Sequence, residues 1–148
     1  MGFGVPAAIG AKFACPTEEV WAIVGDDGFQ MTMTELGTAV QENVDVNIAI
    51  LNNGFLGMVR QWQEMFYEER YEATPMFNPD FVKLAEAYGI PSMRVTARDQ
   101  IEESIRFARS HQGPTLIEYV IEKDDIVYPM VPAGADLHNM IRRPKQEG

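Results

Sequence analysis

Two short polar turns carry the residues of this sequence that are best suited to hold a ligand. Gly25-Asp26-Asp27-Gly28 follows one apolar run, and Asn52-Asn53-Gly54 follows another. A carboxylate and an amide oxygen are hard donors that suit Mg²⁺ or Ca²⁺, and Mg²⁺ in proteins keeps several positions for water or phosphate oxygens. The turns therefore predict a divalent-cation site that can hold a phosphorylated ligand, provided that the fold brings Asp26 and Asn53 together.

The residues around the first turn would help to bind such a ligand. Gly25 and Gly28 would let the backbone approach a phosphate closely, and a helix predicted to begin near Thr32 would offer free N–H groups. Taken alone, Gly-Asp-Asp-Gly is more typical of a tight acidic turn than of a binding site. The second polar turn, at the end of another strand-like run, favours the binding site.

Four strand-like runs must position these turns. They cover residues 20–24, 46–51, 92–96 and 115–121, and helical patterns separate them. Strands that alternate with single helices need crossover connections, which imply a parallel sheet. The sequence therefore predicts an α/β fold with a doubly wound, mostly parallel sheet and helices on both faces. In right-handed crossovers both turns lie at the carboxyl edge of that sheet, where open α/β folds bind ligands.

Three helices have start signals in the sequence. Thr32-Met33-Thr34-Glu35 has the spacing of a capping box, and Asn78-Pro79 places a capping residue before a first-turn proline. Asp99 with Glu102 opens the third helix. The residues at helical spacing after each signal, Ile101 among them, are predicted to face the core.

Length and composition indicate one folded domain. The chain has 148 residues, of which 46% are hydrophobic and 23% are charged. We expect residues 1–122 to form the α/β domain and residues 123–148 to form an extended C-terminal tail of the same domain. Cys15 is the single cysteine, which excludes an internal disulfide and a thiolate zinc cluster and fits a reducing compartment.

The charge balance and the hydropathy pattern restrict the partners. With 12 Lys and Arg against 22 Asp and Glu, the formal net charge is −10, which disfavours nucleic acid as a partner. A chain this acidic needs backbone N–H groups or a bridging cation to hold a phosphate. No uncharged run reaches the roughly 18 residues of a membrane helix. We therefore expect neither a nucleic-acid nor a membrane partner, and we expect a cytoplasmic location, or an organellar one in a eukaryote.

The polar turns and several other segments resemble a known enzyme family. The segment 25–31 and the 27-residue step from Asp26 to Asn53 resemble the thiamine diphosphate motif of 2-oxoacid decarboxylases and carboligases. Four further segments, at 1–11, 57–63, 78–81 and 128–132, resemble the catalytic subunits of the acetolactate synthase (acetohydroxyacid synthase) family. Over nearly its whole length the chain is similar to the C-terminal thiamine diphosphate-binding domain of that family.

The resemblance implies thiamine diphosphate and Mg²⁺ as cofactors and gives individual residues a role. It implies that Asp26 and Asn53 bind Mg²⁺ through their side chains and Phe55 through its main-chain oxygen. The remaining cofactor contacts that it implies are Met1, Gly25, Asp27, Gly28, Gly57 and Met58. Met1 would wedge the cofactor into a bent form, and Met58 would lie near its pyrimidine ring.

Two further residues matter in the resemblance. Trp62 matches the tryptophan that shapes the pocket for the second 2-oxoacid in the family. Asp27 departs from the family pattern, which usually has Gly or Ala there. An additional carboxylate repels a diphosphate unless it points away or reaches the metal.

The activity implied is that of a thiamine diphosphate-dependent transferase. Acetolactate synthases condense a hydroxyethyl unit from pyruvate with a second 2-oxoacid, in branched-chain amino acid biosynthesis. The resemblance implies no catalytic residue in this chain, because the family's general-base glutamate belongs to a separate pyrimidine-binding domain of the neighbouring subunit. We expect the isolated chain to be inactive. The partners implied are a pyrimidine-binding domain or subunit, further copies of this chain and a regulatory subunit.

Other interpretations are open at this point. The chain can be the small subunit of a two-chain 2-oxoacid decarboxylase, or a non-catalytic oligomerisation module derived from the same fold. A signalling receiver domain is disfavoured, because the strand at 46–51 ends in Asn52-Asn53 rather than in a phosphoacceptor aspartate. From spacing alone, the stripe of Phe55, Met58, Val59, Trp62 and Phe66 predicts core packing of a helix rather than substrate contact.

Overall fold

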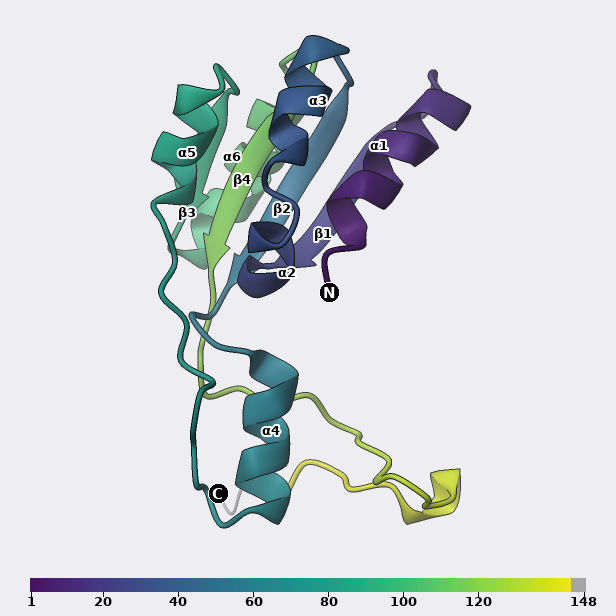
Figure 1. Ribbon diagram of the computed structural model, residues 1–148, viewed down its shortest axis with the longest axis vertical. Helices are drawn as coiled ribbons and strands as arrows, with labels where there is room; N and C mark the ends of the chain where they lie inside the picture. Colours follow the sequence, from purple (N-terminus) through teal and green to yellow (C-terminus); the bar gives the residue numbers. More distant parts are fainter. Residues whose placement is uncertain (145–148) are drawn as a thin grey trace.

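Four parallel strands form the centre of the structure (Figure 1). A computed structural model describes residues 1–144. The strands are β1 (Val20–Gly25), β2 (Val46–Asn52), β3 (Ser92–Val95) and β4 (Thr115–Val120), and their order in the sheet is β1-β2-β4-β3. Every pairing between them is parallel. The predicted α/β class and parallel sheet are confirmed.

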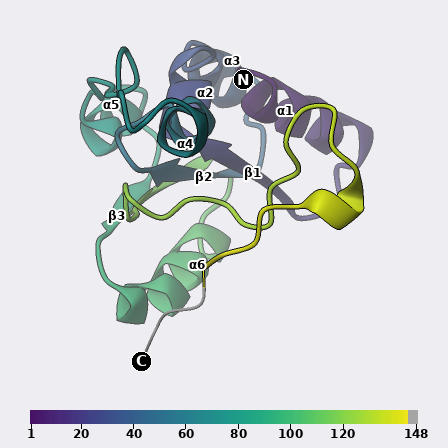
Figure 2. The same cartoon turned by 90° about the horizontal axis from the view of Figure 1, so that it is seen from below.

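Helices cover both faces of the sheet, as Figure 2 shows. One face carries α1 (Gly4–Ala14), α2 (Asp26–Gln30), α3 (Glu35–Gln41) and α5 (Phe81–Ala87). The other face carries α6 (Ile101–Arg109), which follows the short 3-10 helix η1 (Arg98–Gln100). A second 3-10 helix, η2, spans Leu137–Asn139. Among residues 1–144, no helix has the length and apolar character needed to cross a bilayer.

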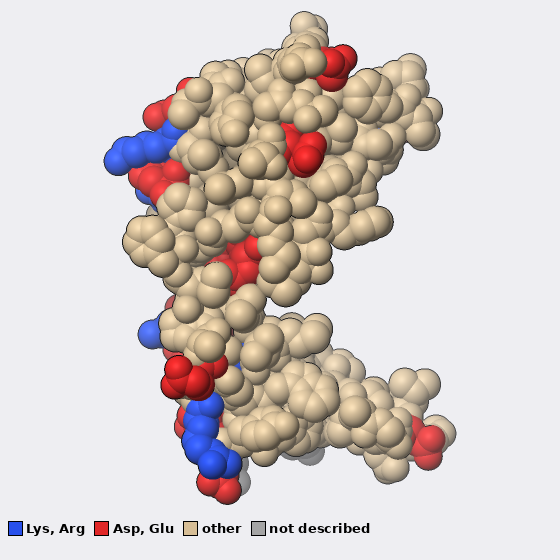
Figure 3. All heavy atoms as spheres, in the orientation of Figure 1, with Lys and Arg blue, Asp and Glu red and all other residues tan. Residues whose placement is uncertain are grey.

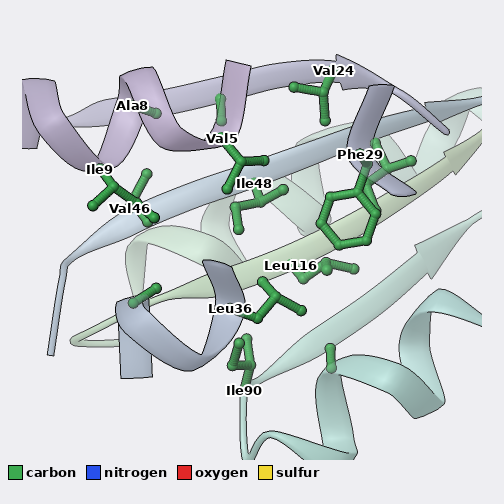
Figure 4. Packing of buried hydrophobic residues seen from close by; sticks show 14 of the residues in the cluster. Val5, Ala8, Ile9, Val24, Phe29, Leu36, Val46, Ile48, Ile90 and Leu116 are labelled. Atoms are coloured by element: carbon green, nitrogen blue, oxygen red, sulfur yellow. The ribbon is translucent and has the colours of Figure 1, made fainter. Parts of the chain in front are cut away.

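The main core lies between the sheet and the four helices α1, α2, α3 and α5 (Figure 4). Side chains of a strand alternate between the two faces, so Val46, Ile48 and Ile50 of β2 all point into this core and are fully buried. Phe29 of α2 and Phe81 of α5 meet edge to face, with their ring centroids 5.4 Å apart. This packing fixes the start of α2, and with it the first polar turn, against the sheet.

The helix starts differ from the predicted ones. Thr32 caps no helix, because residues 31–34 form consecutive turns and α3 begins at Glu35 with helical backbone angles at Thr34. Within residues 1–144 the buried Thr32 hydroxyl has no hydrogen-bond partner. Asn78 does not cap α5 either. Asp80 does so, because its backbone is extended and its Oδ1 accepts a hydrogen bond from Lys83 N at 3.3 Å.

The inward face of α6 is also different from the prediction. Ile101 is 40% exposed, because it is the first residue of α6 and follows η1 at the rim of the sheet. Ser104 is buried instead, and its Oγ lies 2.9 Å from Tyr119 Oη. Ala108 packs in the smaller core cluster with Val95 and Ile117, as expected.

Helix α4 (Gly57–Phe66) stands beyond the carboxyl ends of the strands, next to the segment 121–144 (Figure 1). We call α4 together with residues 121–144 the α4 lobe. Arg60 donates hydrogen bonds to the Lys123 carbonyl and, at 2.6 Å, to Asp124 Oδ1. Gln61 exchanges two hydrogen bonds with the backbone of Val127. These contacts attach the start of the predicted tail to α4; residues 145–148 of that tail lie outside the described residues.

Candidate functional site

A cleft of about 470 Å³ separates the carboxyl edge of the sheet from α4. In Figure 3 the molecule is deeply notched between the α/β layers and the α4 lobe, and the walls of the notch are mostly uncharged. All nine cofactor-contact residues that the sequence predicted line the cleft: Met1, Gly25, Asp26, Asp27, Gly28, Asn53, Phe55, Gly57 and Met58. They come from the chain start, the turn after β1, the turn after β2 and the start of α4.

Asp26 joins the two predicted turns. It is the first residue of α2, directly after β1, and only 2% of it is exposed. Its Oδ2 accepts a hydrogen bond from Gly54 N at 2.9 Å and another from Asn78 Nδ2 at 2.6 Å. Because Gly54 belongs to the turn after β2, the structure brings the turn of Asp26 and the turn of Asn53 together, as the parallel topology requires.

Hydrogen bonding and backbone geometry hold Asn53 close to the N-terminus of α4. Its Oδ1 accepts a hydrogen bond from Phe55 N at 3.2 Å, and Gly54 between them has a φ of +70°, which glycine adopts without strain. A Cβ on Gly57 would lie 3.1 Å from Asn53 Nδ2. The absence of a side chain at position 57 therefore leaves room for the Asn53 amide beside the cleft.

Asp27 is a second buried carboxylate at the same turn. It is 6% exposed, and its Oδ1 has no hydrogen-bond partner among the described residues. Burial, together with the negative charge of Asp26, raises the pKa of Asp27 to about 6. Buried polar atoms normally have a hydrogen-bond partner. An oxygen without one beside a cleft is therefore available to a cation or to a hydrogen-bond donor of a ligand.

A chain of polar side chains continues from Asp26 into the sheet. Asn78 Nδ2 also donates to Asn52 Oδ1 at 2.8 Å, and Asn52 Nδ2 donates to Glu118 Oε1 at 2.7 Å. Glu118 is 3% exposed in the central strand β4 and accepts a hydrogen bond from Arg94 Nε at 2.6 Å. The sequence predicted neither Asn78 nor Glu118 as a site residue. The one available signal was a glutamate inside the otherwise uncharged strand Thr115–Val120.

The aromatic and methionine side chains of the prediction divide into two groups. Met1 and Met58 line the cleft and are 71% and 77% exposed. Trp62 is half-buried against Phe66, with ring centroids 5.1 Å apart, and does not line the cleft. The prediction that the whole stripe from Phe55 to Phe66 packs in the core is wrong, since Met58, Val59 and Phe66 are exposed. The reason is that α4 stands clear of the sheet and packs against the loop segments next to it, through Gln63 with Glu72 and Thr74 and through Gln61 with Val127.

The backbone around the first turn is open to a ligand. Apart from the residues next to it in the chain, no atom of residues 1–144 lies within 4 Å of the position that a Cβ on Gly25 would occupy. Helix α3, which was expected to point its N–H groups at the ligand, does not line the cleft, because α2 intervenes and begins at Asp26 itself. The residues present thus fit a metal-bridged phosphate, because Asp26 and Asn53 offer two hard oxygen donors and Gly25 leaves the backbone open.

Most of the chain matches a known protein family. Residues 1–119 match the family described as "Thiamine pyrophosphate enzyme, C-terminal TPP binding domain". The chain belongs to this family; thiamine pyrophosphate is another name for thiamine diphosphate.

Two relatives among known proteins are more specific. The chain is 50% identical to the mitochondrial acetolactate synthase catalytic subunit of Aspergillus candidus, over 95% of this chain and 20% of that protein. It is 47% identical to the acetolactate synthase of Arthrospira platensis, over 95% of this chain and 25% of that protein. The chain therefore spans about a fifth to a quarter of the length of these curated relatives.

A solved structure supports the fold. The thiamine diphosphate-dependent 4-hydroxybenzoylformate decarboxylase of Rhodococcus jostii RHA1 superposes with a TM-score of 0.78 at 34% identity. The match covers 84% of this chain and 24% of that chain. This chain is thus a thiamine pyrophosphate-binding type of α/β domain related to acetolactate synthases.

Proposed function

We propose that the chain binds the diphosphate of thiamine diphosphate, through Mg²⁺, in the cleft between the sheet and α4. The observation that carries the proposal is the bond from Gly54 N to Asp26 Oδ2, at 2.9 Å. It holds a buried carboxylate against the turn that presents Asn53 and Phe55. Asp26, Asn53 and the main-chain oxygen of Phe55 would hold the metal.

The charge of the chain makes the metal necessary. With a net charge of −10 and two buried aspartates at the turn, the protein repels a bare diphosphate. A divalent cation offsets the charge of the two carboxylates and accepts phosphate oxygens alongside water. The exposed side chains of Met1 and Met58 would provide the apolar contacts for the rings of the cofactor.

The reaction proposed is that of the acetolactate synthases, in which pyruvate and a second 2-oxoacid form an acetohydroxyacid. The bound cofactor supplies the nucleophilic carbon for this chemistry, and the protein positions it. We propose that the chain is inactive by itself, since no residue here matches the family's general-base glutamate. A pyrimidine-binding domain would have to supply that group. General acid–base assistance contributes typically ~10²–10⁴-fold to a rate.

We propose that partners bind at the apolar side chains that border the cleft. Met1, Phe3, Ile23 and Met58 are each at least 70% exposed. Exposed apolar patches of this kind drive association. We propose that a pyrimidine-binding domain or a further copy of the chain covers them. A strictly monomeric chain at high concentration by light scattering would contradict self-association.

Calorimetric titration tests the proposal most directly. Thiamine diphosphate should bind in the presence of Mg²⁺ and fail to bind in EDTA. Asp26→Ala should abolish the metal-dependent binding, whereas Asp27→Gly should leave it intact or strengthen it. Equal binding in EDTA and in Mg²⁺ would refute the site. For the reaction, acetolactate should form from pyruvate only after a separately expressed pyrimidine-binding domain is added, and substitution of Trp62 should then alter the choice of the second 2-oxoacid.

A further inference from the structure

The two carboxylate oxygens of Asp26 have different surroundings. Within residues 1–144, the hydrogen bonds that reach this carboxylate, from Gly54 N and from Asn78 Nδ2, both fall on Oδ2. With Oδ2 occupied by two donors, Oδ1 is the atom left available to a cation. The carboxylate is thus prepared to bind a metal through one oxygen rather than through two.

Asn78 is itself held in one orientation. Gln30 Nε2 donates to Asn78 Oδ1 at 2.7 Å, so the amide nitrogen of Asn78 faces Asp26 and Asn52. Its two N–H groups match the two acceptors, Asp26 Oδ2 at 2.6 Å and Asn52 Oδ1 at 2.8 Å. All polar atoms of the Asn78 amide are therefore engaged, and a rotation of this side chain would break three hydrogen bonds.

The support of Asn78 extends to the buried carboxylate of Glu118 and its ion pair with the partly exposed Arg94. Asn52, which accepts from Asn78, donates to Glu118, and Glu118 pairs with Arg94 at 2.6 Å. Glu118 lies on the central strand β4 and is 3% exposed. The orientation of Asn78 is consequently anchored in the sheet rather than in a surface loop.

We infer that Asn78 is a positioning residue for the metal site: it holds Asp26 so that a single oxygen meets the cation. The inference rests on the proposed function. Mg²⁺ requires near-ideal octahedral geometry with single-oxygen ligands, whereas Ca²⁺ readily accepts a bidentate carboxylate. Asn78 therefore sets the preference of the site for Mg²⁺ over Ca²⁺.

The test compares two metals rather than activity. Thiamine diphosphate is titrated by calorimetry into the wild-type chain and into Asn78→Leu, once with Mg²⁺ and once with Ca²⁺. Loss of an outer hydrogen-bond partner of a metal ligand typically costs about 10–100-fold in affinity. We expect Asn78→Leu to lose affinity to that degree with Mg²⁺. With Ca²⁺ the loss should be under about threefold, because the freed carboxylate can turn and bind through both oxygens.

Asp80→Ala is the matched control. Asp80 lies two residues after Asn78, caps α5 and pairs with Arg94, but within residues 1–144 it forms no hydrogen bond with Asp26 or Asn78. We expect this variant to lower Tm while the ratio of Mg²⁺-supported to Ca²⁺-supported affinity stays that of the wild type. If Asn78→Leu fails to fold, Gln30→Leu removes the bond that orients Asn78 and should lower the same ratio to a smaller extent.

The outcomes separate this inference from the proposed function. A wild-type chain that binds thiamine diphosphate equally well without metal would refute both. If wild-type binding needs metal and Asp26→Ala abolishes it, but Asn78→Leu binds like the wild type, the inference alone is wrong. Equal losses with Mg²⁺ and Ca²⁺ in Asn78→Leu would also overturn it, since a general loss of structure does not distinguish the two cations.

Discussion

Asp27 follows Asp26 directly in the chain, yet the two buried carboxylates are satisfied to different degrees. Oδ2 of Asp26 accepts two hydrogen bonds, whereas Oδ1 of Asp27 has no partner within residues 1–144. Burial and the charge of its neighbour raise the pKa of Asp27 from 3.8 to about 6. The ionised form of Asp27 therefore destabilises the folded chain in the absence of a ligand.

This relationship predicts a pH-dependent effect of Asp27→Asn. Between about pH 4 and 6 the folded state holds a proton on Asp27 that the unfolded state has lost, so the contribution of this residue to stability falls as the pH rises. Above about pH 6 the penalty is constant, at most about 3 kcal/mol. In urea unfolding, the gain from Asp27→Asn should be near zero at about pH 4 and largest above about pH 6.5. A gain that is the same at every pH would contradict this assignment.

Gly57→Ala should separate stability from binding. A Cβ at position 57 would lie 3.1 Å from Asn53 Nδ2, which is close enough to push that amide out of its present position. Alanine also favours a helix over glycine, by up to about 1 kcal/mol. We expect unfolding stability to be unchanged or higher, while Mg²⁺-dependent binding of thiamine diphosphate weakens.

Gly10→Ala is the control for that experiment. Gly10 lies in α1, and a Cβ there would meet no atom within 4 Å. This variant should gain a similar stability by thermal unfolding and bind thiamine diphosphate like the wild type. Unaltered binding by Gly57→Ala would show that the Asn53 side chain has no part in the site.

Gly4→Ala should destabilise the fold through α1. A Cβ on Gly4 would clash with Val24 Cγ1, and the β-branched Val24 is stiff and buried in the core. Overpacking of this kind costs about 1–3 kcal/mol. The double variant Gly4→Ala with Val24→Ala should be more stable than the sum of the two single effects allows, as measured by a urea double-mutant cycle. Strict additivity would mean that the helix moves away without cost.

Arg60→Ala should loosen the α4 lobe. The guanidinium lies 4.9 Å from the ring centroids of both Phe55 and Tyr71 and also donates to Lys123 and Asp124. Two cation–π contacts and a charged hydrogen bond to a carbonyl together contribute about 2–4 kcal/mol. Urea unfolding should show this loss, and limited proteolysis should cut the segment after β4 faster.

Asp124→Ala tests which part of that contact matters. The Asp124 side chain is 61% exposed, so its ion pair with Arg60 is screened by water. We expect a loss below about 1 kcal/mol in the same measurement. A loss equal to that of Arg60→Ala would mean that the ion pair, rather than the rings and the carbonyl, holds the lobe.

The amino-acid sequence alone determined the parallel sheet and the meeting of the two polar turns. Apolar runs, helix periodicity and the hand of crossover connections are properties of short segments, and they place Asp26 and Asn53 at one edge of the sheet. The family relationship likewise follows from the sequence, since the segments that carry it are continuous. All residues so predicted as cofactor contacts line one cleft.

Only the tertiary structure decided what Asn78 and α4 do. Asn78 has the local pattern of a helix cap, but Asp26 and Asn52 lie 52 and 26 residues away in the chain and offer it charged and polar acceptors, while Asp80 takes over the capping. The stripe on α4 has the pattern of a core helix, yet Met58 and Val59 face the cleft. A local pattern records which side chains share a face, whereas the contacts of that face depend on segments distant in the chain that meet only when the sheet has formed.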